Sequence, residues 1–428
     1  MNKRIYVLFI SFYVLTVYVS AQSGTNSPYS MYGLGILSER SQGFNRGMAG
    51  ISQGFREGTY VNPQNPASYS NVDSLTFIFD AAVALQNMNI SENGVKNNAK
   101  NGNFEYVVAS FRVLKNLGAS FGIMPFTNVG YDFSRTGTTQ NKDIYSTTYT
   151  GSGGLHQAYI GFGWRPFKPF SVGFNIGYLW GSQTKVVATS YSSGATPLNR
   201  YYTSDVNSYT LDLGMQYSFR VGKDDNIVLG ATYSLGHELG NTAYMYDILN
   251  DSTQYSVKDA FSMPHIVSGG VAWHRPDKWS FGIDYTFYKF GSLAYPDVIN
   301  TSANRIDYQK RDGLLMDRSK IAVGGERIPG KYSRNFFERI HYRAGAYFAT
   351  PYVKVYDASG KLIDGPKEYG VSVGLGIPIM NTYNNRSLLN VSGQWVYSGM
   401  SNLIKENYLR LTIGLTFNEK WFAKWKFE

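Results

Sequence analysis

The amino-acid sequence predicts an all-β protein, a fourteen-stranded antiparallel transmembrane β-barrel with an N-terminal plug inside the lumen. Only 16% of its 428 residues are charged, while 16% are aromatic; ordinary globular proteins have about 25% charged residues. After the N-terminal leader, no run of about 20 apolar residues offers a membrane helix. Apolar and polar residues instead alternate along most of the chain, as expected when lipid-facing residues alternate with lumen-facing ones.

Residues 1–21 have the features of a secretory signal peptide. Lys3 and Arg4 form a basic start, an apolar run covers 5–19, and Ser20 and Ala21 supply the small residues of a cleavage site. The alternative is an N-terminal anchor, for which the apolar run is short. The chain has no Cys, which excludes disulfides, thiolate metal sites and a lipidated N-terminus. Its net charge of +10 is scattered, so we expect no nucleic-acid partner.

A period of two dominates from about residue 75, and runs such as 209–219 and 170–180 have one apolar face and one polar or small face. Strands of about 10–14 residues are longer than those of most soluble sheets. Many apolar faces end in aromatic residues, which favours a membrane barrel over a soluble β-protein. The expected strand cores are 74–89, 104–116, 117–134, 154–166, 169–187, 205–221, 226–241, 264–275, 278–291, 317–328, 338–349, 367–379, 385–398 and 406–418.

The connections between these strands alternate in length. Tight links at 116–117, 167–168, 222–225 and 276–277 alternate with long polar segments at 135–153, 188–204, 242–263 and 292–316. Outer-membrane barrels have short periplasmic turns and long extracellular loops. We therefore expect a barrel domain at 74–418 in a Gram-negative type of outer membrane, surrounded by its lipid, with both termini and a 419–428 tail in the periplasm.

The segment 22–73 lacks strand alternation and is long enough to fill the lumen of a barrel of this size. Phe44, Met48, Ile51 and Phe55 fall at roughly helical spacing and are the expected contacts of a ligand or of the barrel wall. Several glycines between them would permit close packing in a narrow tube. We interpret 22–73 as a plug, with a disordered periplasmic tail as the alternative.

Three motifs in this segment resemble the N-terminal hatch of FadL-type outer-membrane proteins. They are 27–35 (SPYSMYGLG), 45–50 (NRGMAG) and 62–69 (NPQNPASY), the last of which contains the Asn65-Pro66-Ala67 motif. Proteins of that family are fourteen-stranded barrels with an N-terminal plug that pass hydrophobic compounds such as long-chain fatty acids, often through a lateral gap at a kinked third strand. The resemblance therefore implies such a ligand here, with Asn65, Pro66 and Ala67 among the contacts.

The third expected strand contains Gly122, Pro125, Phe126 and Asn128. Because proline cannot donate to a β-ladder, it is confined to edges, strand starts and bulges. A closed barrel has no edge, so Pro125 predicts a local break in strand pairing. The break is either a side opening into lipid or a bulge at the rim of the barrel.

Polar residues on the inner faces of the strands are interpreted as plug-holding contacts, since buried charges need partners or water. The alternative is a solvated lumen without specific pairs. The candidates are Arg112, Asp212, Arg220, Asp284 and Arg410.

No catalytic, metal or cofactor site is expected. The five His residues stand apart without metal-ligand spacing, and no Ser-His pair is marked as a dyad. The leading functional hypothesis is passive, plug-gated uptake of a hydrophobic small molecule. The alternative is a non-conducting barrel bound to other proteins of an outer-membrane assembly complex, which is favoured by a chain that continues past the last strand and ends on Glu428.

Overall fold

The computed structural model describes residues 24–92, 94–139, 142–194, 196–248, 252–302, 305–357, 360–379, 387–400 and 403–419. The expected signal peptide at 1–21 and nearly all of the 419–428 tail lie outside these residues. Among the described residues, no helix combines the length and the apolarity needed to cross a bilayer.

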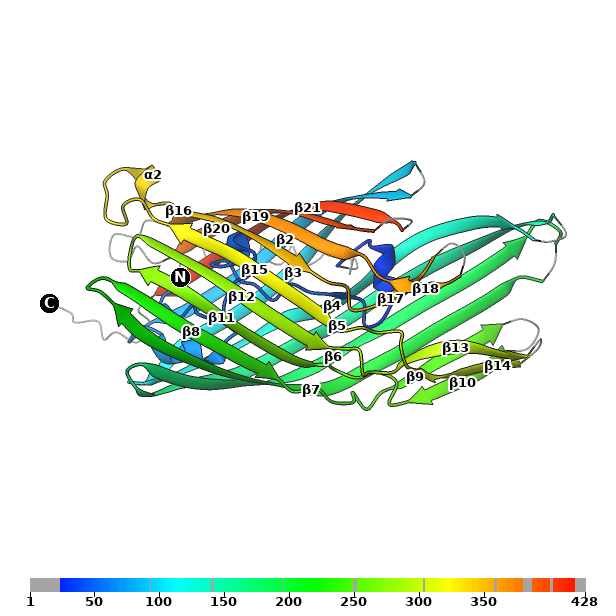
Figure 1. Ribbon diagram of the computed structural model, residues 1–428, viewed down its shortest axis with the longest axis horizontal. Coiled ribbons are helices and arrows are strands. Elements are labelled where there is room, and N and C mark those ends of the chain that lie inside the picture. Colours follow the sequence, from blue (N-terminus) through cyan, green and yellow to red (C-terminus); the bar gives the residue numbers. More distant parts are fainter. Residues whose placement is uncertain are drawn as a thin grey trace, which may run out of the picture.

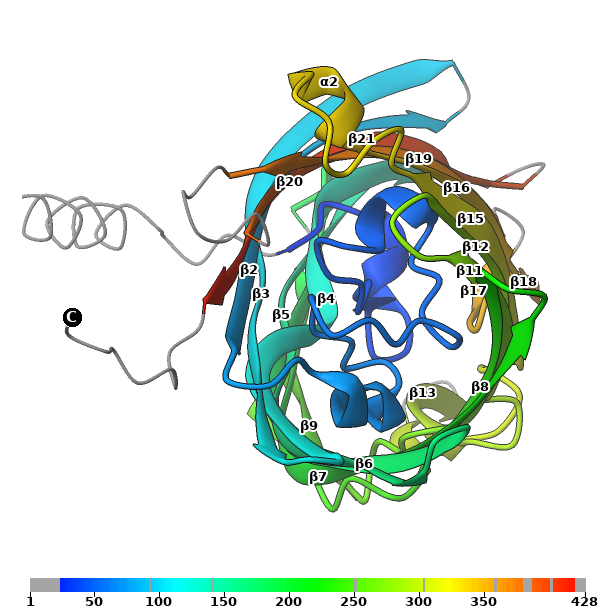
Figure 2. The same ribbon diagram turned by 90° about the vertical axis from the view of Figure 1, so that its left-hand side faces the viewer.

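Fourteen antiparallel strands form a closed barrel, as the sequence predicts, and pairing of the first strand with the last closes it (Figures 1 and 2). The strands are β2 (Phe77–Glu92), β3 (Val95–Leu114), β4 (Leu117–Thr138), β5 (Ile144–Phe167), β6 (Phe170–Tyr191), β7 (Leu198–Val221), β8 (Asp225–Ser234), β11 (His265–Arg275), β12 (Trp279–Lys289), β15 (Arg318–Arg327), β16 (His341–Ala349), β19 (Lys367–Pro378), β20 (Leu388–Gly399) and β21 (Lys405–Glu419).

Several segments expected as loops are strands instead. The expected loops 135–153 and 188–204 lie mostly in extensions of β4, β5, β6 and β7. The expected loop 242–263 contains a hairpin of β9 (Thr242–Ile248) and β10 (Ser252–Lys258), and β9 pairs with the extension of β7. Two small hairpins stand at the same end: β13 (Tyr295–Ser302) with β14 (Arg305–Arg311), and β17 (Lys354–Tyr356) with β18 (Leu362–Asp364). These hairpin strands are short and mix polar with apolar residues, such as Val298, Ile306 and Val355, so they lack the long one-sided apolar pattern of the other strands.

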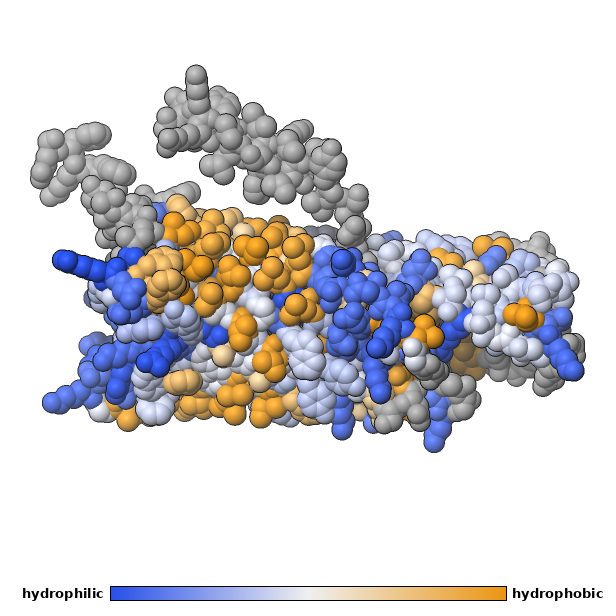
Figure 3. Space-filling model, turned by 90° about the horizontal axis from the view of Figure 1, so that it is seen from above, coloured by the Kyte–Doolittle hydropathy of each residue, from blue (hydrophilic) through white to orange (hydrophobic). Residues whose placement is uncertain are grey.

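The two ends of the barrel differ, and we call them the long-loop end and the short-turn end. Tight turns join β3 to β4, β5 to β6, β7 to β8 and β11 to β12 at the short-turn end. The connection between β15 and β16 at this end is longer and contains α2 (Phe336–Arg339), which lies outside the ring of strands (Figure 2). On the face that Figure 3 shows, a band of apolar side chains covers the outer wall in the half nearer the short turns, and the wall beyond it is mainly hydrophilic.

Residues 24–73, which we call the plug, lie inside the barrel (Figure 2). Their regular structure is limited to η1 (Pro28–Met31), β1 (Ile36–Leu37), η2 (Arg46–Met48) and η3 (Pro66–Asn71). The roughly helical spacing of apolar residues in 44–55 produces only the single turn η2. This turn ends at Ala49 and Gly50, whose φ angles of 57° and 78° are left-handed.

Inward-facing glycines allow the plug backbone to touch the wall. A Cβ at Gly173 of β6 would lie 2.4 Å from the carbonyl carbon of Pro66, and one at Gly118 of β4 would lie 1.9 Å from the carbonyl oxygen of Tyr69. On the opposite wall, a Cβ at Gly345 would lie 2.4 Å from the carbonyl carbon of Met48. The wall and plug are therefore complementary at the level of backbone atoms.

We expect Gly173→Ala to displace η3 and to destabilise the protein by about 1–3 kcal/mol, the usual cost of overpacking. The matched control is Gly393→Ala, where a Cβ would have its nearest neighbour at 3.9 Å, on a side chain. Thermal unfolding in detergent checks the difference. Equal midpoints for the two variants would show that the plug is not packed against β6.

Candidate functional site: the plugged lumen and a break in its wall

The barrel wall is interrupted between its second and third strands. Strands β3 and β4 pair only over Val107–Leu114 and Leu117–Ile123. The β3 residues before Val107 do not pair with the β4 residues after Ile123. Gly122 lies in the last paired rows, opposite Val108. On the other side of β4, the ladder with β5 contains a bulge between Pro125 and Thr127. The break that Pro125 predicts is therefore present in the third strand of the barrel.

The bulge also changes which side chains face inward. Phe121 and Ile123, before the bulge, are exposed on the outer wall, whereas Val129 and Tyr131, after it, are buried. Phe126, the extra residue of the bulge, points into an apolar cluster of the lumen and is 7% exposed. An added residue in one strand has this effect because side chains alternate between faces.

Residues 24–38, which we call the strap, cover the break from inside. Strand β1 pairs antiparallel with β4 at Thr127 and Asn128, where β3 has already separated. The amide of Ser38 donates to the Phe126 carbonyl over 3.0 Å, and Asn128 Nδ2 donates to Ser38 Oγ over 2.8 Å. At its beginning, the carbonyl of Gly24 accepts from Asn103 Nδ2 of β3 at 2.7 Å. The strap thus bridges both rims of the break.

A cavity of about 680 Å³ lies between the strap and the barrel wall. Its lining combines apolar side chains with charged ones, which include Glu105, Arg318, Lys320, Glu406 and Arg410, and it reaches Pro125 and Asn128 at the break. Ser27 Oγ lies 2.7 and 2.8 Å from the two carboxylate oxygens of Glu406, so the strap is attached to β21 as well as to β3 and β4.

A second cavity of about 690 Å³ lies nearer the long-loop end and has an aromatic lining. It shares Tyr29 with the first cavity. Lys185 contributes its ammonium group, which donates to the carbonyl of Met31 at 2.7 Å and to the hydroxyl of Tyr295 at 3.0 Å. Burial lowers the pKa of this ammonium group to about 8. The other aromatic residues around the cavity are Tyr32, Tyr131, Phe133, Tyr149, Tyr202, Phe261, Tyr308 and Tyr356.

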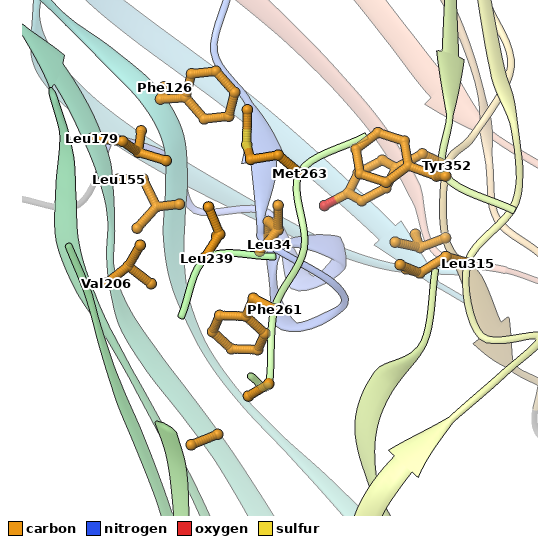
Figure 4. Packing of buried hydrophobic residues seen from close by; sticks show 14 of the residues in the cluster. Leu34, Phe126, Leu155, Leu179, Val206, Leu239, Phe261, Met263, Leu315 and Tyr352 are labelled. Atoms are coloured by element: carbon orange, nitrogen blue, oxygen red, sulfur yellow. The ribbon is translucent and has the colours of Figure 1, made fainter. Parts of the chain in front are cut away.

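The lumen beside this aromatic cavity is filled by apolar side chains from segments distant in sequence (Figure 4). Leu34 of the strap packs among Leu155 and Leu179 of the wall and Phe261, Met263 and other residues of the long connections. Tyr352 also binds the strap through a hydrogen bond, which its hydroxyl donates to the carbonyl of Gly35. At this level the lumen is closed mainly by the packing of apolar side chains.

Deeper in the lumen, the plug is held by buried charges. Arg46 Nη1 and Glu105 Oε2 are 2.7 Å apart, with side chains 1% and 6% exposed. Glu105 is the extra residue of a β3 bulge opposite Ala82 and Val83, which turns its carboxylate into the lumen. Burial disfavours ionisation of the neighbouring Glu39, but the positive charge of Arg46, with smaller contributions from Lys320 and Arg410, prevails and lowers the Glu39 pKa.

Three of the five polar residues selected from the sequence lie in the lumen. Asp212 pairs with Arg40 at 3.0 Å, and Asp284 accepts the backbone amides of Ser52 and Gln53 at 2.6 and 3.0 Å. Arg410 donates to Gln86 at 2.8 Å.

The other two selected residues lie elsewhere. Arg112 donates to the carbonyl of Lys115 in the turn between β3 and β4. Arg220 is exposed at the last position but one of β7, just before the β7–β8 turn. Neither makes a described contact with the plug, because each follows the inward-facing part of its strand.

The apolar plug residues selected from the sequence form the interior of the plug. Phe44, Met48, Ile51 and Phe55 are at most 3% exposed and pack with Ala272, Ala322 and other residues. None of them lines either of the two cavities. Their observed contacts are with plug and wall.

The Asn65-Pro66-Ala67 motif begins η3 and fixes it against the wall. Asn65 caps the turn, its side chain accepting the Ala67 amide, and its Nδ2 also donates to the carbonyls of Gln53 and Met215. Pro66 and Ala67 lie against Gly173.

Sequence reasoning missed several residues at the site. Arg343 of β16 lies 2.6 Å from Glu326 and donates to the carbonyl of Gly43 at 2.9 Å. Glu105 was missed because a bulge decides its direction, and Glu406 was missed because it is the first residue of its expected strand. The described residues contain no group of three or more acidic or His residues placed to hold a metal ion.

Comparison with known proteins gives a family and a fold. The family model described as BamG matches residues 1–428. The chain belongs to the BamG family. No curated protein matches this BamG-family chain.

Solved structures with the same fold include three FadL-type proteins. The Pseudomonas putida toluene transporter TodX is 15% identical with a TM-score of 0.60, over 91% of this chain and 100% of TodX. The Ralstonia pickettii toluene transporter TbuX is 15% identical with a TM-score of 0.59, over 88% and 98%. A Pseudomonas aeruginosa FadL homologue is 11% identical with a TM-score of 0.58, over 90% and 99%. The predicted resemblance to FadL-type proteins is confirmed for the fold.

We expect Arg46→Met and Glu105→Met to destabilise the plug by about 3–5 kcal/mol each, because each leaves one buried charge without its partner. The double variant should be less destabilised than either single variant. The control is Arg135→Met, which breaks a pair of the same 2.7 Å length whose side chains are 46% and 40% exposed and should cost about 1 kcal/mol or less. Limited proteolysis and thermal unfolding measure the stabilities of the four variants. If the losses of stability in the two single variants simply added in the double variant, the buried pair would be contradicted.

Proposed function

We propose that this BamG-family barrel lies in the outer membrane, with its short turns and both termini in the periplasm, and admits a hydrophobic small molecule by passive movement. The observation that carries the proposal is the break between β3 and β4 beside a cavity of about 680 Å³. The same fold occurs in proteins described as toluene transporters, which supports this class of ligand.

The two cavities suggest a route. A ligand from the long-loop end enters the aromatic cavity, passes Tyr29, which both cavities share, and reaches the break beside Pro125. The strap occupies the break in the resting protein, and its hydrogen bonds to β4 must open for the ligand to leave sideways. The remaining plug, fixed by Arg46, Asp212 and Asp284, stays in place.

Gating by the strap can be tested with a reversible disulfide cross-link. Because the chain has no native Cys, only the two introduced thiols can form it. In Ser38→Cys/Asn128→Cys, oxidation joins the strap to β4, where the native side chains are 2.8 Å apart. We expect uptake of a labelled long-chain fatty acid into liposomes to fall to background when oxidised and to return on reduction.

The matched control joins β3 to β4 where they are already paired. Ser110 and Ser120 face each other across this ladder, so oxidation of Ser110→Cys/Ser120→Cys should leave flux unchanged. Equal flux before and after oxidation of the strap pair would refute gating by the strap.

The aromatic cavity offers a cation for an acidic ligand. Because the pKa of Lys185 is lowered to about 8, its ammonium is charged below that pH and loses its charge above it, whereas a fatty-acid carboxylate stays ionised throughout this range. We expect fatty-acid affinity to fall as pH rises from 7 to 9 and to be independent of pH in Lys185→Met. Isothermal titration in detergent measures both, and a parallel pH dependence in the two proteins would exclude Lys185.

A second candidate function is a non-conducting subunit of an outer-membrane assembly complex. It is favoured by exposed aromatics in the β15–β16 connection at the short-turn end, where Tyr332 is 82% exposed, Phe337 67% and Phe336 43%. Exposed apolar clusters commonly mark interaction sites. Affinity purification in mild detergent distinguishes this function: stoichiometric envelope proteins that are lost in Phe336→Ser/Phe337→Ser, together with no flux in the wild type, would favour it over the channel.

A further inference from the structure

The strand register aligns three lysines in one row of the wall near the long-loop end. Lys96 of β3 pairs with Ser91 of β2, and Ser91 pairs with Lys405 of β21. The register of β20 with β21 brings Gly399 level with Lys405, and Gly399 pairs with Lys367 of β19. The lysines therefore occupy alternate strands, about 10 Å apart at the usual spacing of two strands.

All three lysines lie on the outer face. Each is exposed, and alternation along the strand places Lys405 on the same side as Leu409, which is 57% exposed, and Lys367 on the same side as Tyr369, which is 46% exposed. The intervening Glu406 faces the lumen and is 3% exposed.

The outer surface changes in steps from this row toward the short-turn end. The next outward row contains Asn98, Asn89 and Asn407, whose side-chain amides hydrogen bond in series at 2.8 and 3.3 Å, followed by Tyr397 and Tyr369. The row after that contains the exposed Leu409, Trp395 and Val371, where the apolar band begins. The same row continues through Asn87 of β2 to a fourth exposed lysine, Lys100 of β3. Figure 3 shows this side of the barrel, with hydrophilic atoms bordering the band.

The same outward positions carry no acidic side chain. Those described in these five strands are Lys, Asn, Ser, Tyr, Gly, Trp, Leu and Val, at 367, 369, 371, 395, 397, 399, 405, 407, 409, 87, 89, 91, 96, 98 and 100. The patch is cationic and is not neutralised within its own surface. We call the residues Lys96, Lys367 and Lys405 the lysine row.

We propose that the lysine row binds the headgroup of a phosphorylated glycolipid in the outer leaflet of the membrane. The apolar band contacts the acyl chains, the Asn and Tyr row hydrogen bonds with sugar hydroxyls, and the lysines pair with phosphates. A sugar headgroup with a phosphate at each end fits cations on alternate strands better than a phospholipid with a single phosphate. The proposal uses the topology proposed above, in which the long-loop end faces outward, and is independent of whether the lumen conducts.

The test is native mass spectrometry of the full protein in mild detergent, titrated with bisphosphorylated diglucosamine lipid (lipid A), its monophosphorylated form, phosphatidylglycerol or inorganic phosphate. We expect the bisphosphorylated lipid to bind most tightly. The Lys96→Gln/Lys367→Gln/Lys405→Gln variant should bind it at least about tenfold more weakly, as loss of several lysine–lipid charge interactions implies.

The matched control is Lys115→Gln/Lys168→Gln/Lys223→Gln, which removes three exposed lysines from tight turns at the other end. It should bind as the wild type does. Equal weakening in both triple variants, or none in the lysine-row variant, would overturn the site. Equal binding of phosphatidylglycerol, or displacement of the glycolipid by inorganic phosphate alone, would overturn the assignment to a phosphorylated glycolipid. Flux of a hydrophobic ligand should be the same in both triple variants, which separates this proposal from the channel.

Discussion

Backbone groups that line an open edge in a barrel wall need hydrogen-bond partners, and this requirement organises the site. Beyond Ile123, β4 has an edge that β3 does not pair with. Ile36 and Leu37 of the plug pair with that edge, Ser38 donates to it, and Ser30 Oγ both accepts from and donates to Gly130. The position of the strap therefore follows from the unpaired edge, since an unsatisfied group in an apolar surrounding is costly.

The rest of the plug is positioned by two different kinds of complementarity. Backbone contacts at Gly118 and Gly173 fix η3 against one wall, and a contact at Gly345 fixes η2 against the opposite wall. Buried charge pairs, such as Arg46 with Glu105, then hold the plug in a single arrangement relative to the wall. The strap has hydrogen bonds and apolar packing but, among its described contacts, no ion pair of this kind. This difference is the physical basis for assigning movement to the strap and a fixed role to the rest of the plug.

Much of the fold follows from sequence periodicity alone. Alternation along the strands and the alternation of short and long connections predict fourteen strands, and Pro125 predicts the break in β4. The extensions near the long-loop end were not predicted, because segments such as 144–153 are polar on both faces and show no one-sided pattern. Two inward-facing acidic residues were also missed: a bulge turns Glu105 inward, and Glu406 stands at the very start of its expected strand. Helical spacing of Phe44 and Met48 identifies plug interior but does not produce a long helix.

The account depends most directly on the strap protecting the open edge of β4. Hydrogen exchange of the Gly130 amide, which donates to Ser30 Oγ at 3.0 Å, measures this protection residue by residue. We predict slow exchange in the intact protein and fast exchange in a variant lacking residues 24–38, with amides in the paired β3–β4 rows unchanged. Equally fast exchange at Gly130 in both proteins would show that the strap does not protect this edge, and the gate described here would be wrong.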